Sequence, residues 1–484
     1  MNQPISTSSA DFARELRLDQ LRMLIGGELV AGGGHSPIED PATGETILNS
    51  PTASPEQVRQ AVAAARAAAR TWGRSDHAER AAVVEQIADA LISNLERLAT
   101  LVVLEQGKPI EEARSDVTRA SEFARYMAGL RLECELLVDD ATHQVWLSPR
   151  PLGVVAAIVP WNFPLYQAVF KMVQAVMAGN SVIVKPAPTS PLSALALGEY
   201  LAHVVPPGLV NVIGDDGQVG PLLVDADGID KVSFTGSTAT GRLVMAGAAR
   251  TLKRLTLELG GNDAAIVLDD VDVSAVAEKL VATSFKNAGQ VCISSKRIFA
   301  PREIYEDLAE AMGNIVAQFP LGHGLDPATR LGPVQNRKQF EAASRWLEQA
   351  RHEGRIVTGG RTLDRPGYFV EPTLVTDLQA DASLLSDEVF APIRSVIPYD
   401  VIDHAIDAAN ASPYGLGASV WSSDRERALK LADQLDAGTV WINQHGALRQ
   451  DVPYGGMKQS GFGMEFGQAG LREYTSTQVI SVLK

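Results

Sequence analysis

Residues 153–187, "GVVAAIVPWNFPLYQAVFKMVQAVMAGNSVIVKPA", decide the fold class of this chain. The segments 154–159 ("VVAAIV") and 181–185 ("SVIVK") are short apolar runs rich in Val and Ile. Such runs are typical of strands that are buried on both faces of a sheet. The segment between them, "LYQAVFKMVQAVMA", has the length and composition of a helix. Strand, helix and strand in this order predict a βαβ unit, whose two strands lie parallel.

The same alternation continues along most of the chain. Two more strands are expected at 209–213 and 231–234, with helices after each apolar run. A second α/β series begins after about residue 258, with strands at 264–268, "RIFA", "SVIPY", "ASVW" and "TVWIN" and helices near 273–287, 303–318 and 336–353. The pattern predicts an α/β protein with two doubly wound parallel-sheet lobes that join near residue 258.

The two ends of the chain show different patterns. Amphipathic helices are expected at 55–72, 77–99 and 110–130, with Ser54 as the N-cap of the first and Pro55 at its first position. The C-terminal "TSTQVISVLK" (475–484) reads as a strand with no neighbour in sequence. It must pair elsewhere, either with "HQVWLSP" (143–149) or across a subunit boundary.

Composition limits the partners and the compartment. The chain has 43 Lys and Arg against 58 Asp and Glu, a net charge of −15, which argues against nucleic acid or an anionic membrane as partner. No apolar run reaches the roughly 18 residues of a membrane span, and the N-terminus does not resemble a signal peptide. Two cysteines exclude both a disulfide scaffold and a cysteine-built metal site. We expect a cytoplasmic protein.

Three short motifs follow expected strands, where ligands of parallel sheets bind. Asn162 in "VPWNFPL" offers an amide that could donate to an oxyanion, and Lys185 ends a strand within reach of a ligand hydroxyl or phosphate. Gly236 and Ser237 stand between a strand and a helix, an arrangement that suits a pyrophosphate. Simpler interpretations also fit: a rigid aromatic turn, a surface lysine and an ordinary helix N-cap.

Two further residues have the chemistry of a catalytic pair. Glu258 alternates with leucines in "LTLELGGND" (255–263), and burial there would raise its pKa and suit a general base. An exposed edge-strand glutamate is the alternative. Cys292 lies in "NAGQVCISSK" (287–296), a loop-like setting in which a nucleophile is more natural than a core residue. Cys134, in the apolar "LRLECELLV", is interpreted as structural.

Taken together and in this order, the motifs resemble those of the aldehyde dehydrogenase superfamily over nearly the full chain. The matching stretches are "PWNFP" (160–164), "KPA" (185–187), "SFTGS" (233–237), "LELGGNDA" (257–264), "FKNAGQVCISSK" (285–296), "DEVFAPI" (387–393) and "PYGGMKQSGFG" (453–463).

The resemblance implies a role for each matching position. Cys292 would attack the aldehyde, Asn162 and the Cys292 backbone N–H would hold the oxyanion, and Glu258 would activate water for deacylation. These steps convert an aldehyde to its acid through a thiohemiacetal and a thioester, with NAD or NADP and without a metal. The implied cofactor contacts are Lys185, Gly236, Ser237, Trp161, Glu388 and Phe390.

The resemblance also implies three parts and an assembly. Residues 1–130 and 150–258 would bind the dinucleotide, 259–470 would form the catalytic domain, and 131–149 with 471–484 would form an oligomerisation element. A homodimer or a homotetramer is expected.

One position departs from the family pattern. Many NAD-preferring members carry a glutamate where this chain has Pro188, three residues after Lys185. Loss of that carboxylate removes a ribose hydroxyl acceptor and also a repulsion against a 2′-phosphate. We therefore expect both cofactors to work, with NAD favoured.

Three other functions fit parts of this sequence. A coenzyme-A-acylating relative would pass the acyl group to a thiol, but such members often lack the glutamate that Glu258 represents. A cysteine hydrolase or thioesterase would cleave esters without a cofactor. A non-catalytic protein on the same fold is the third, although every chemical position is filled.

The substrate pocket is predicted from residues near the catalytic motifs. Tyr166 and Phe170 follow Asn162 on a helix together with Gln167, Val291 and Ile293 flank Cys292, and residues 443–452 supply another wall. No cluster of Arg or Lys stands out in these segments, so a neutral, medium-sized aliphatic or aromatic aldehyde is expected as the partner.

Overall fold

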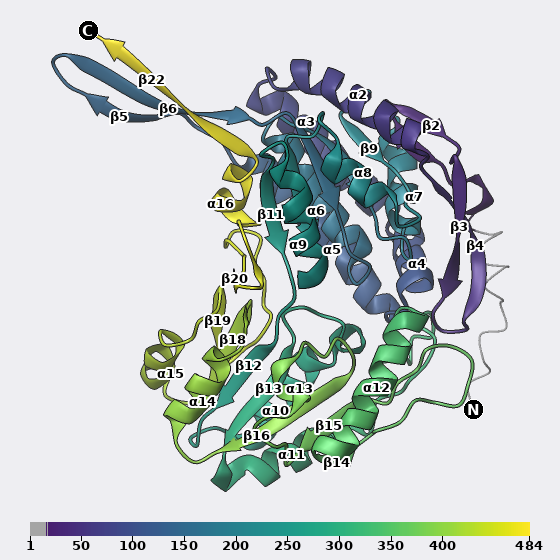
Figure 1. Cartoon of the computed structure of the whole chain (residues 1–484), viewed down its shortest axis with the longest axis vertical. Coiled ribbons are helices and arrows are strands. Elements are labelled where there is room, and N and C mark those ends of the chain that lie inside the picture. The colour runs from purple at the N-terminus through teal and green to yellow at the C-terminus, as the bar shows by residue number, and fades with distance from the viewer. Residues whose placement is uncertain (1–15, 17) are drawn as a thin grey trace.

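The computed structural model describes residue 16 and residues 18–484. Two α/β lobes lie one above the other, and a narrow three-stranded arm projects from the upper lobe (Figure 1). The expected fold class, two doubly wound parallel-sheet lobes with a small β element, is confirmed.

The first lobe is built on an eight-stranded sheet of order β2-β1-β9-β8-β7-β10-β11-β21. The strands are β1 (Met23–Ile25), β2 (Glu28–Val30), β7 (Val154–Ile158), β8 (Ser181–Lys185), β9 (Val210–Val212), β10 (Lys231–Thr235), β11 (Arg254–Glu258) and β21 (Gly461–Phe462). The five strands β7 to β11 are parallel, and their order reverses between β7 and β10. That reversal point is where open α/β sheets bind ligands.

The opening βαβ unit forms as expected. β7 and β8 are buried along their whole length and pair in parallel, joined by α6 (Pro164–Met177). The remaining helices of this lobe are α2 (Pro55–Trp72), α3 (His77–Ser93), α4 (Leu95–Gln106), α5 (Ile110–Gly129), α7 (Leu192–Leu201), α8 (Val219–Asp225) and α9 (Thr238–Ala249). Helices lie on both sides of the sheet (Figure 1). Ser54 caps α2 and Pro55 is its first residue, as predicted.

The prediction of a single helix over residues 77–99 is wrong. The chain forms two helices there, because Asn94, at φ −122° and ψ 20°, leaves the helical conformation between α3 and α4. Its side-chain Nδ2 donates to the carbonyl of Ala90 and so closes the last turn of α3. Apolar residues continue through both helices, so hydrophobic periodicity alone did not reveal the break.

The second lobe contains a seven-stranded sheet of order β14-β15-β16-β13-β12-β18-β19. The strands are β12 (Asp263–Val267), β13 (Ser295–Pro301), β14 (Arg355–Thr358), β15 (Thr373–Thr376), β16 (Ile393–Tyr399), β18 (Gly417–Trp421) and β19 (Thr439–Ile442). The helices are α10 (Val273–Ser284), α11 (Arg302–Val316), α12 (Arg337–Glu353), α13 (Ser383–Ser386), α14 (Ile402–Asn410) and α15 (Arg425–Ala432). All pairs except β14 with β15 are parallel.

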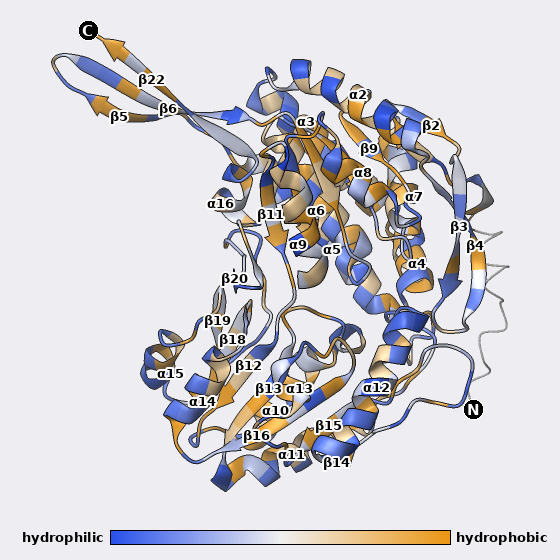
Figure 2. Ribbon diagram, viewed as in Figure 1, coloured by the Kyte–Doolittle hydropathy of each residue, from blue (hydrophilic) through white to orange (hydrophobic). Residues whose placement is uncertain are grey.

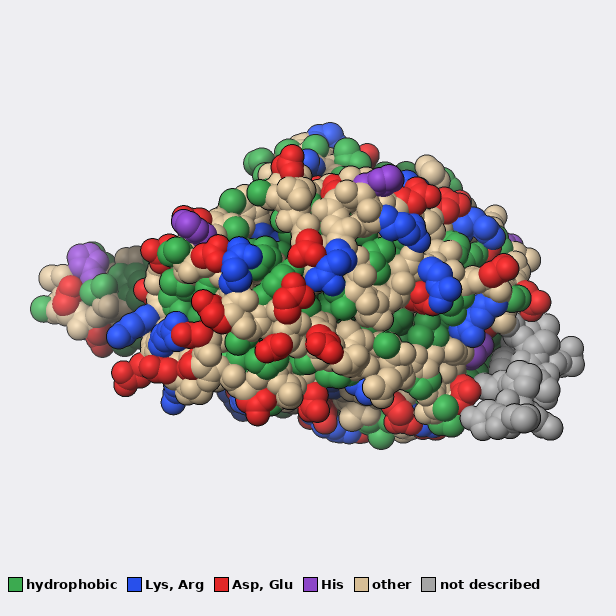
Figure 3. All heavy atoms as spheres, turned by 90° about the horizontal axis from the view of Figure 1, so that it is seen from below, with side chains coloured by type: hydrophobic (Ala, Val, Ile, Leu, Met, Phe, Trp, Pro, Cys, Tyr) green, Lys and Arg blue, Asp and Glu red, His purple; other side chains and the backbone are tan. Residues whose placement is uncertain are grey.

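The hydropathy of the two lobes follows their burial. Apolar residues are concentrated on the central strands, and hydrophilic residues on the outer helix faces (Figure 2). On the face of the molecule shown in Figure 3, acidic and basic side chains are interspersed, which is typical of a solvated surface. Among the described residues, no helix is long and apolar enough to cross a membrane.

The arm contains the pairing partner of the C-terminal strand. β22 (Thr475–Leu483) pairs antiparallel with β6 (His143–Pro151), which pairs with β5 (Glu135–Asp139). The first of the two predicted pairings is thereby confirmed. α16 (Gly467–Arg472) connects the lobes to this arm. Cys134 is exposed just before β5 rather than in an apolar core, so its interpretation as a structural residue is wrong.

The remaining described elements are short. They are the hairpin β3 (Gly34–Asp40) with β4 (Glu45–Thr52), the pair β17 (Tyr414–Gly415) with β20 (Met457–Lys458), and the 3₁₀ turns η1 (Leu18–Gln20) and η2 (Lys286–Gly289). β21 belongs by sequence to the segment assigned to the catalytic part, yet it pairs with β11 of the first sheet.

Candidate active site

The site lies where the carboxyl edge of the first sheet faces the amino edge of the second. Glu258 is the last residue of β11, and residues 259–262 cross directly to β12. Cys292 lies in the loop that leads into the amino end of β13. The paired glycines after Glu258 allow this close approach: a Cβ at Gly261 would lie 2.8 Å from the carbonyl oxygen of Cys292. One at Gly260 would overlap the carboxylate of Glu388.

The turn before Cys292 is held in an unusual backbone conformation. Asn287, Ala288 and Gly289 all have positive φ, at 51°, 53° and 70°. A Cβ at Gly289 would collide with the carbonyl of Ala391 and lie 2.6 Å from Nη2 of Arg394. Buried Arg394 donates to the carbonyl of Gly289 at 3.0 Å. Only glycine fits at this position, which explains why a glycine stands three residues before the cysteine.

Lys296 fixes the other side of the cysteine loop. Its buried Nζ donates to the carbonyl of Cys292 at 2.7 Å and to that of Val291 at 3.1 Å. Nδ1 of His445 shares a hydrogen bond with the hydroxyl of Ser419. Its Nε2 donates to the carbonyl of Ile293 at 2.7 Å. The residues on both sides of Cys292 are therefore tied to buried side chains.

Asn162 is equally well fixed. Its Nδ2 donates to the carbonyl of Gln290 at 3.0 Å, which uses one of its two N–H groups. Its own carbonyl accepts from Nδ2 of Asn287 and from Nζ of Lys108, at 2.9 and 3.0 Å. The second N–H of the amide remains for a ligand beside Cys292, because both side chains line the same cavity.

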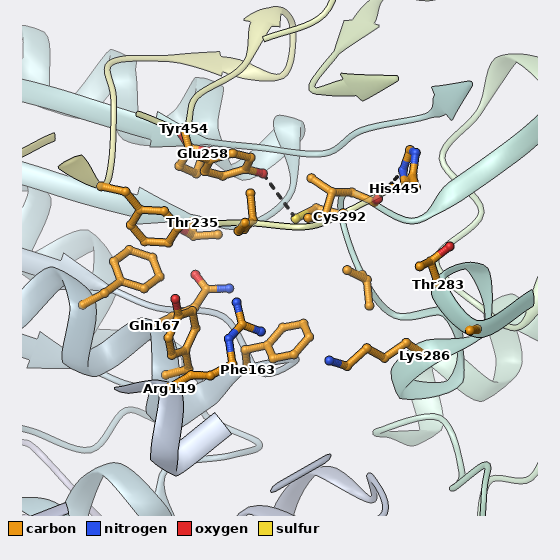
Figure 4. A pocket seen from close by; sticks show the side chains of 18 residues that line it. Arg119, Phe163, Gln167, Thr235, Glu258, Thr283, Lys286, Cys292, His445 and Tyr454 are labelled. Carbon is orange, nitrogen blue, oxygen red and sulfur yellow. Dashed lines mark hydrogen bonds between the residues drawn. The ribbon is translucent and has the colours of Figure 1, made fainter. Parts of the chain in front are cut away.

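Two cavities meet at Cys292. The larger, of about 220 Å³, is lined by Glu258 and by aromatic and aliphatic residues (Figure 4). The smaller, of about 170 Å³, is lined by Trp161, Gly236, Ser237, Glu388 and Phe390. Cys292, Thr235 and Gln167 border both. The thiol therefore faces a compartment on each side.

The surroundings of Cys292 favour its neutral thiol form. Burial raises its pKa to about 12, against the opposing pull of Lys296. The side-chain polar contact of its Sγ is with the hydroxyl of Tyr454, at 3.9 Å (Figure 4). The expected environment that favours a thiolate is thus absent among the described residues, and an attacking Cys292 needs a group that takes its proton.

Glu258 has the properties of that acceptor. It is buried, and neither carboxylate oxygen has a hydrogen-bond partner among the described residues. Burial raises its pKa well above the usual range, and the nearby Glu465 adds to the effect. The interpretation as an exposed edge-strand residue is excluded, since β11 pairs on both sides. An unpartnered buried carboxyl that faces a cavity is a candidate general base.

The smaller cavity fits the nicotinamide end of a dinucleotide. Trp161 and Phe390 form an edge-on aromatic pair with ring centres 5.5 Å apart. Glu388 accepts from the backbone N–H of Gly261 and is held 3.9 Å from Nζ of Lys296. Ser237 is the N-cap of α9, and a Cβ at Gly236 would lie 2.5 Å from the ring of Phe234. Aromatic faces, a carboxylate and a helix N-terminus match the donor and acceptor set of such a ligand.

Lys185 and Pro188 lie farther along the same edge and do not line that cavity. Lys185 ends β8, and its Nζ contacts Oδ2 of Asp215 at 2.6 Å, with both side chains buried. Oδ1 of Asp215 accepts from the backbone N–H groups of Gly217 and Val219. Sequence reasoning missed Asp215, because the loop that brings it to Lys185 follows a different strand.

The substrate-pocket residues predicted from sequence all line the larger cavity. They are Tyr166, Phe170, Val291 and Ile293, together with Gln167, His445, Gly446 and Leu448. Phe163, Tyr454 and Phe466 also line it and were missed, although Tyr454 stands in a matched motif.

Two basic side chains also line this cavity, Arg119 from α5 and Lys286 from the turn after α10. The premise that no Arg or Lys gathers near the substrate is therefore wrong. Lys286 lies six residues before Cys292 in the quoted motif and could have been noticed. Nothing in the sequence near Arg119 signalled its position, because α5 reaches the pocket only in the folded chain.

Comparison with known proteins agrees with this geometry. Residues 30–480 match the model of the "Aldehyde dehydrogenase family". The phenylacetaldehyde dehydrogenase of Pseudomonas fluorescens is 36% identical over 479 residues, which cover 95% of each chain. An NAD+ complex of an aldehyde dehydrogenase from Bacillus cereus superposes with a TM-score of 0.95 at 34% identity, covering 98% of both chains. An NADP-dependent enzyme of E. coli superposes with a TM-score of 0.93 at 32% identity, covering 96% of this chain and 98% of that one.

The fold and these matches define a nicotinamide-dependent oxidoreductase. The chain belongs to the aldehyde dehydrogenase family and oxidises aldehydes with NAD or NADP.

Proposed function

We propose that the enzyme converts an aldehyde to its carboxylic acid through a covalent thioester on Cys292. The observation that carries this proposal is the meeting of two cavities at one thiol, with Glu258 lining one and Asn162 the other. A thiol, a base and an amide donor around one point are the groups that acyl transfer through cysteine requires.

The chain's residues act in a defined order. Glu258, directly or through water, takes the proton of Cys292, and the sulfur adds to the aldehyde carbon. The free N–H of Asn162 and the backbone N–H of Cys292 stabilise the resulting oxyanion, and one such donor contributes about 2.7–4 kcal/mol. When bound, the cofactor's nicotinamide accepts the hydride that this adduct releases. Glu258 releases the thiol proton to solvent and then deprotonates a water that attacks the thioester. The acid leaves, and the proton taken from that water returns from Glu258 to the sulfur, which restores the thiol.

The cofactor residues follow from the same geometry. Trp161, Phe390 and Glu388 would hold the nicotinamide riboside, and Gly236 with Ser237 the pyrophosphate at the start of α9. Lys185 would bind the adenosine ribose from the end of β8, which lies two strands from β10 in the sheet. We propose that NAD is favoured over NADP, because the carboxylate of Asp215 beside Lys185 would repel a 2′-phosphate. Pro188 offers no carboxylate of its own.

The substrate has an apolar body. The relative named phenylacetaldehyde dehydrogenase acts on an aldehyde of this kind. Phe163, Phe170, Val291, Ile293 and Phe466 give the present cavity similar walls.

We further propose the division and assembly implied by the resemblance. Residues 1–130 with 150–258 bind the dinucleotide, 259–470 form the catalytic part, and 131–149 with 471–484 join subunits into a homodimer or homotetramer. The arm supports the last point, since β5 and β22 expose Leu136, Leu137, Val479 and Leu483. Both cysteines are free thiols, which supports a reducing, cytoplasmic setting.

Incubation with a panel of apolar aldehydes and either cofactor tests the proposal. The expected result is formation of reduced nicotinamide together with an equal amount of free acid. Formation of acyl-coenzyme A without free acid, or ester hydrolysis without any aldehyde oxidation, would replace it by one of the alternative functions.

A further inference from the structure

We infer that Arg119 and Lys286 form a carboxylate-binding site in the substrate cavity, so that the enzyme prefers an aldehyde with an anionic group at its far end. This inference rests on the proposed aldehyde oxidation and names the substrate class. It replaces the neutral aldehyde expected from sequence.

The two cations come from different parts of the fold and face the same space. Arg119 projects from α5 of the first lobe, and Lys286 from the turn that precedes the cysteine loop. Figure 4 shows both side chains pointing into the cavity and toward each other, on either side of the ring of Phe163. Both are half-buried. Glu258 and Tyr454 lie on the opposite side of the cavity in this view.

Neither cation forms an ion pair with another described residue. Most other arginines of α4 and α5 do, for example Arg114 with Glu96 and Arg125 with Glu85. Arg119 instead lies over the ring of Tyr166, 5.1 Å from its centre, and also hydrogen-bonds the Tyr166 hydroxyl. A guanidinium has five N–H groups, so others remain for a ligand. Lys286 interacts electrostatically with buried Glu112, whose pKa is raised by burial. Neither cation is held in a direct ion pair within the part of the chain that the structure describes, so both can meet an anion that enters the cavity.

The rest of the cavity sets the shape of the ligand. The walls of the same cavity include Phe170, Val291 and Ile293, which offer no partner for a charge. The arrangement fits an aldehyde group at the thiol, a short apolar chain and a carboxylate at the Arg119–Lys286 end. Arginine can bind a carboxylate with two N–H groups, and lysine adds a point charge.

The test compares adipate semialdehyde with hexanal, which has the same length without the carboxylate. For the unmodified enzyme we expect kcat/KM to favour the semialdehyde by about 10- to 100-fold, as hydrogen bonds to charged groups provide. The double variant R119M/K286M should lose that preference while retaining turnover of hexanal. The conservative variant R119K/K286R should restore most of it. The control variant R59M removes an exposed cation on α2 and should leave kcat/KM unchanged for both substrates.

Turnover of hexanal reports on the proposed function, and the ratio of the two substrates reports on the inference. Calorimetry with adipate gives a readout that needs no turnover: binding to the unmodified enzyme should weaken by about tenfold or more in R119M/K286M. A wild-type preference for hexanal would overturn the inference. So would equal losses for both substrates in the double variant, or adipate binding that is the same in both proteins.

Discussion

At the scale of single residues, the site depends on burial. Cys292 and Glu258 are both enclosed, and enclosure raises the pKa of each. A raised pKa keeps the thiol protonated until a base takes its proton, and it gives the carboxyl the proton affinity that a base needs. The two shifts are therefore complementary in the proposed mechanism.

Replacement of the nucleophile should abolish turnover. For Cys292→Ala we expect kcat to fall by about 10⁴-fold or more, because no other group among those that line both cavities can form the thioester. Steady-state assays with apolar aldehydes check this. Cys134→Ala, which removes the exposed thiol, is the matched control and should keep full activity. Retained turnover in the first variant would contradict the covalent mechanism.

The base should give a characteristic pH profile. Glu258 acts only when ionised, and its pKa lies well above that of an ordinary carboxyl. The value of kcat/KM should therefore rise with pH through that raised pKa and fall away below it. In Glu258→Gln this limb should disappear and kcat should drop by about 10²- to 10⁴-fold. A profile that keeps the same limb in the variant would assign it to another group.

Cofactor choice should respond to Asp215. Asp215→Asn removes a negative charge beside Lys185 and keeps the acceptor for the N–H groups of Gly217 and Val219. The dissociation constant for NADP, measured by fluorescence quenching, should improve about tenfold relative to that for NAD. Asp216→Asn, at the exposed neighbouring position, is the control. Equal changes in the dissociation constants of NAD and NADP would mean that the 2′-phosphate does not lie beside Asp215.

At the scale of elements, the turn from η2 into the cysteine loop is the most constrained segment. Three consecutive residues with positive φ reverse the chain there, and hydrogen bonds from three other segments hold it. Gln106 of α4 donates to Oδ1 of Asn287, Arg394 donates to Gly289, and the backbone N–H of Gln335 donates to Gln290. Since Cys292 follows directly, its position depends on contacts from both lobes.

A methyl group at Gly289 should test that constraint. Gly289→Ala introduces a Cβ into contact with Ala391 and forces a left-handed conformation on a residue with a side chain. We expect the folded protein to lose about 1–3 kcal/mol of stability and the enzyme to lose activity. Thermal melting measures the first effect, and steady-state kinetics measure the second. Gly217→Ala shares the positive φ, at 98°, but has open space around the added Cβ. It should cost less stability, and an equal cost in the two variants would exclude the clash as the cause.

At the scale of the whole molecule, the exposed arm is the feature that a single chain leaves unexplained. Val479 and Leu483 are 61% and 77% exposed, on a strand whose outer edge pairs with no other described strand. Apolar residues gathered on a projecting sheet are typical of a subunit contact.

Charge on the arm should therefore disrupt assembly. Val479→Asp should shift the mass measured by light scattering toward that of one chain, because a buried carboxylate in a contact is costly. Leu429→Asp replaces an apolar residue that is 49% exposed on α15 of the second lobe, away from the arm (Figure 1), and should leave the mass unchanged. An unchanged mass in both variants would locate the subunit contact on another surface.

The sequence by itself determined the elements and the order of the motifs. Apolar runs such as 154–159 and 181–185 report strands directly, because burial on both faces leaves no room for alternation. The motifs around Cys292 and Glu258 were also evident, since the turn and the paired glycines each require particular residues.

The tertiary structure decided which side chains meet. Arg119 reaches the substrate cavity, Asp215 reaches Lys185 and Tyr454 reaches the thiol, and each of these contacts forms only in the folded chain. Burial had to be seen as well, because the raised pKa of Cys292 depends on what surrounds it rather than on its neighbours in sequence. Local patterns encode local conformation, whereas contacts between distant segments arise only when the cores form.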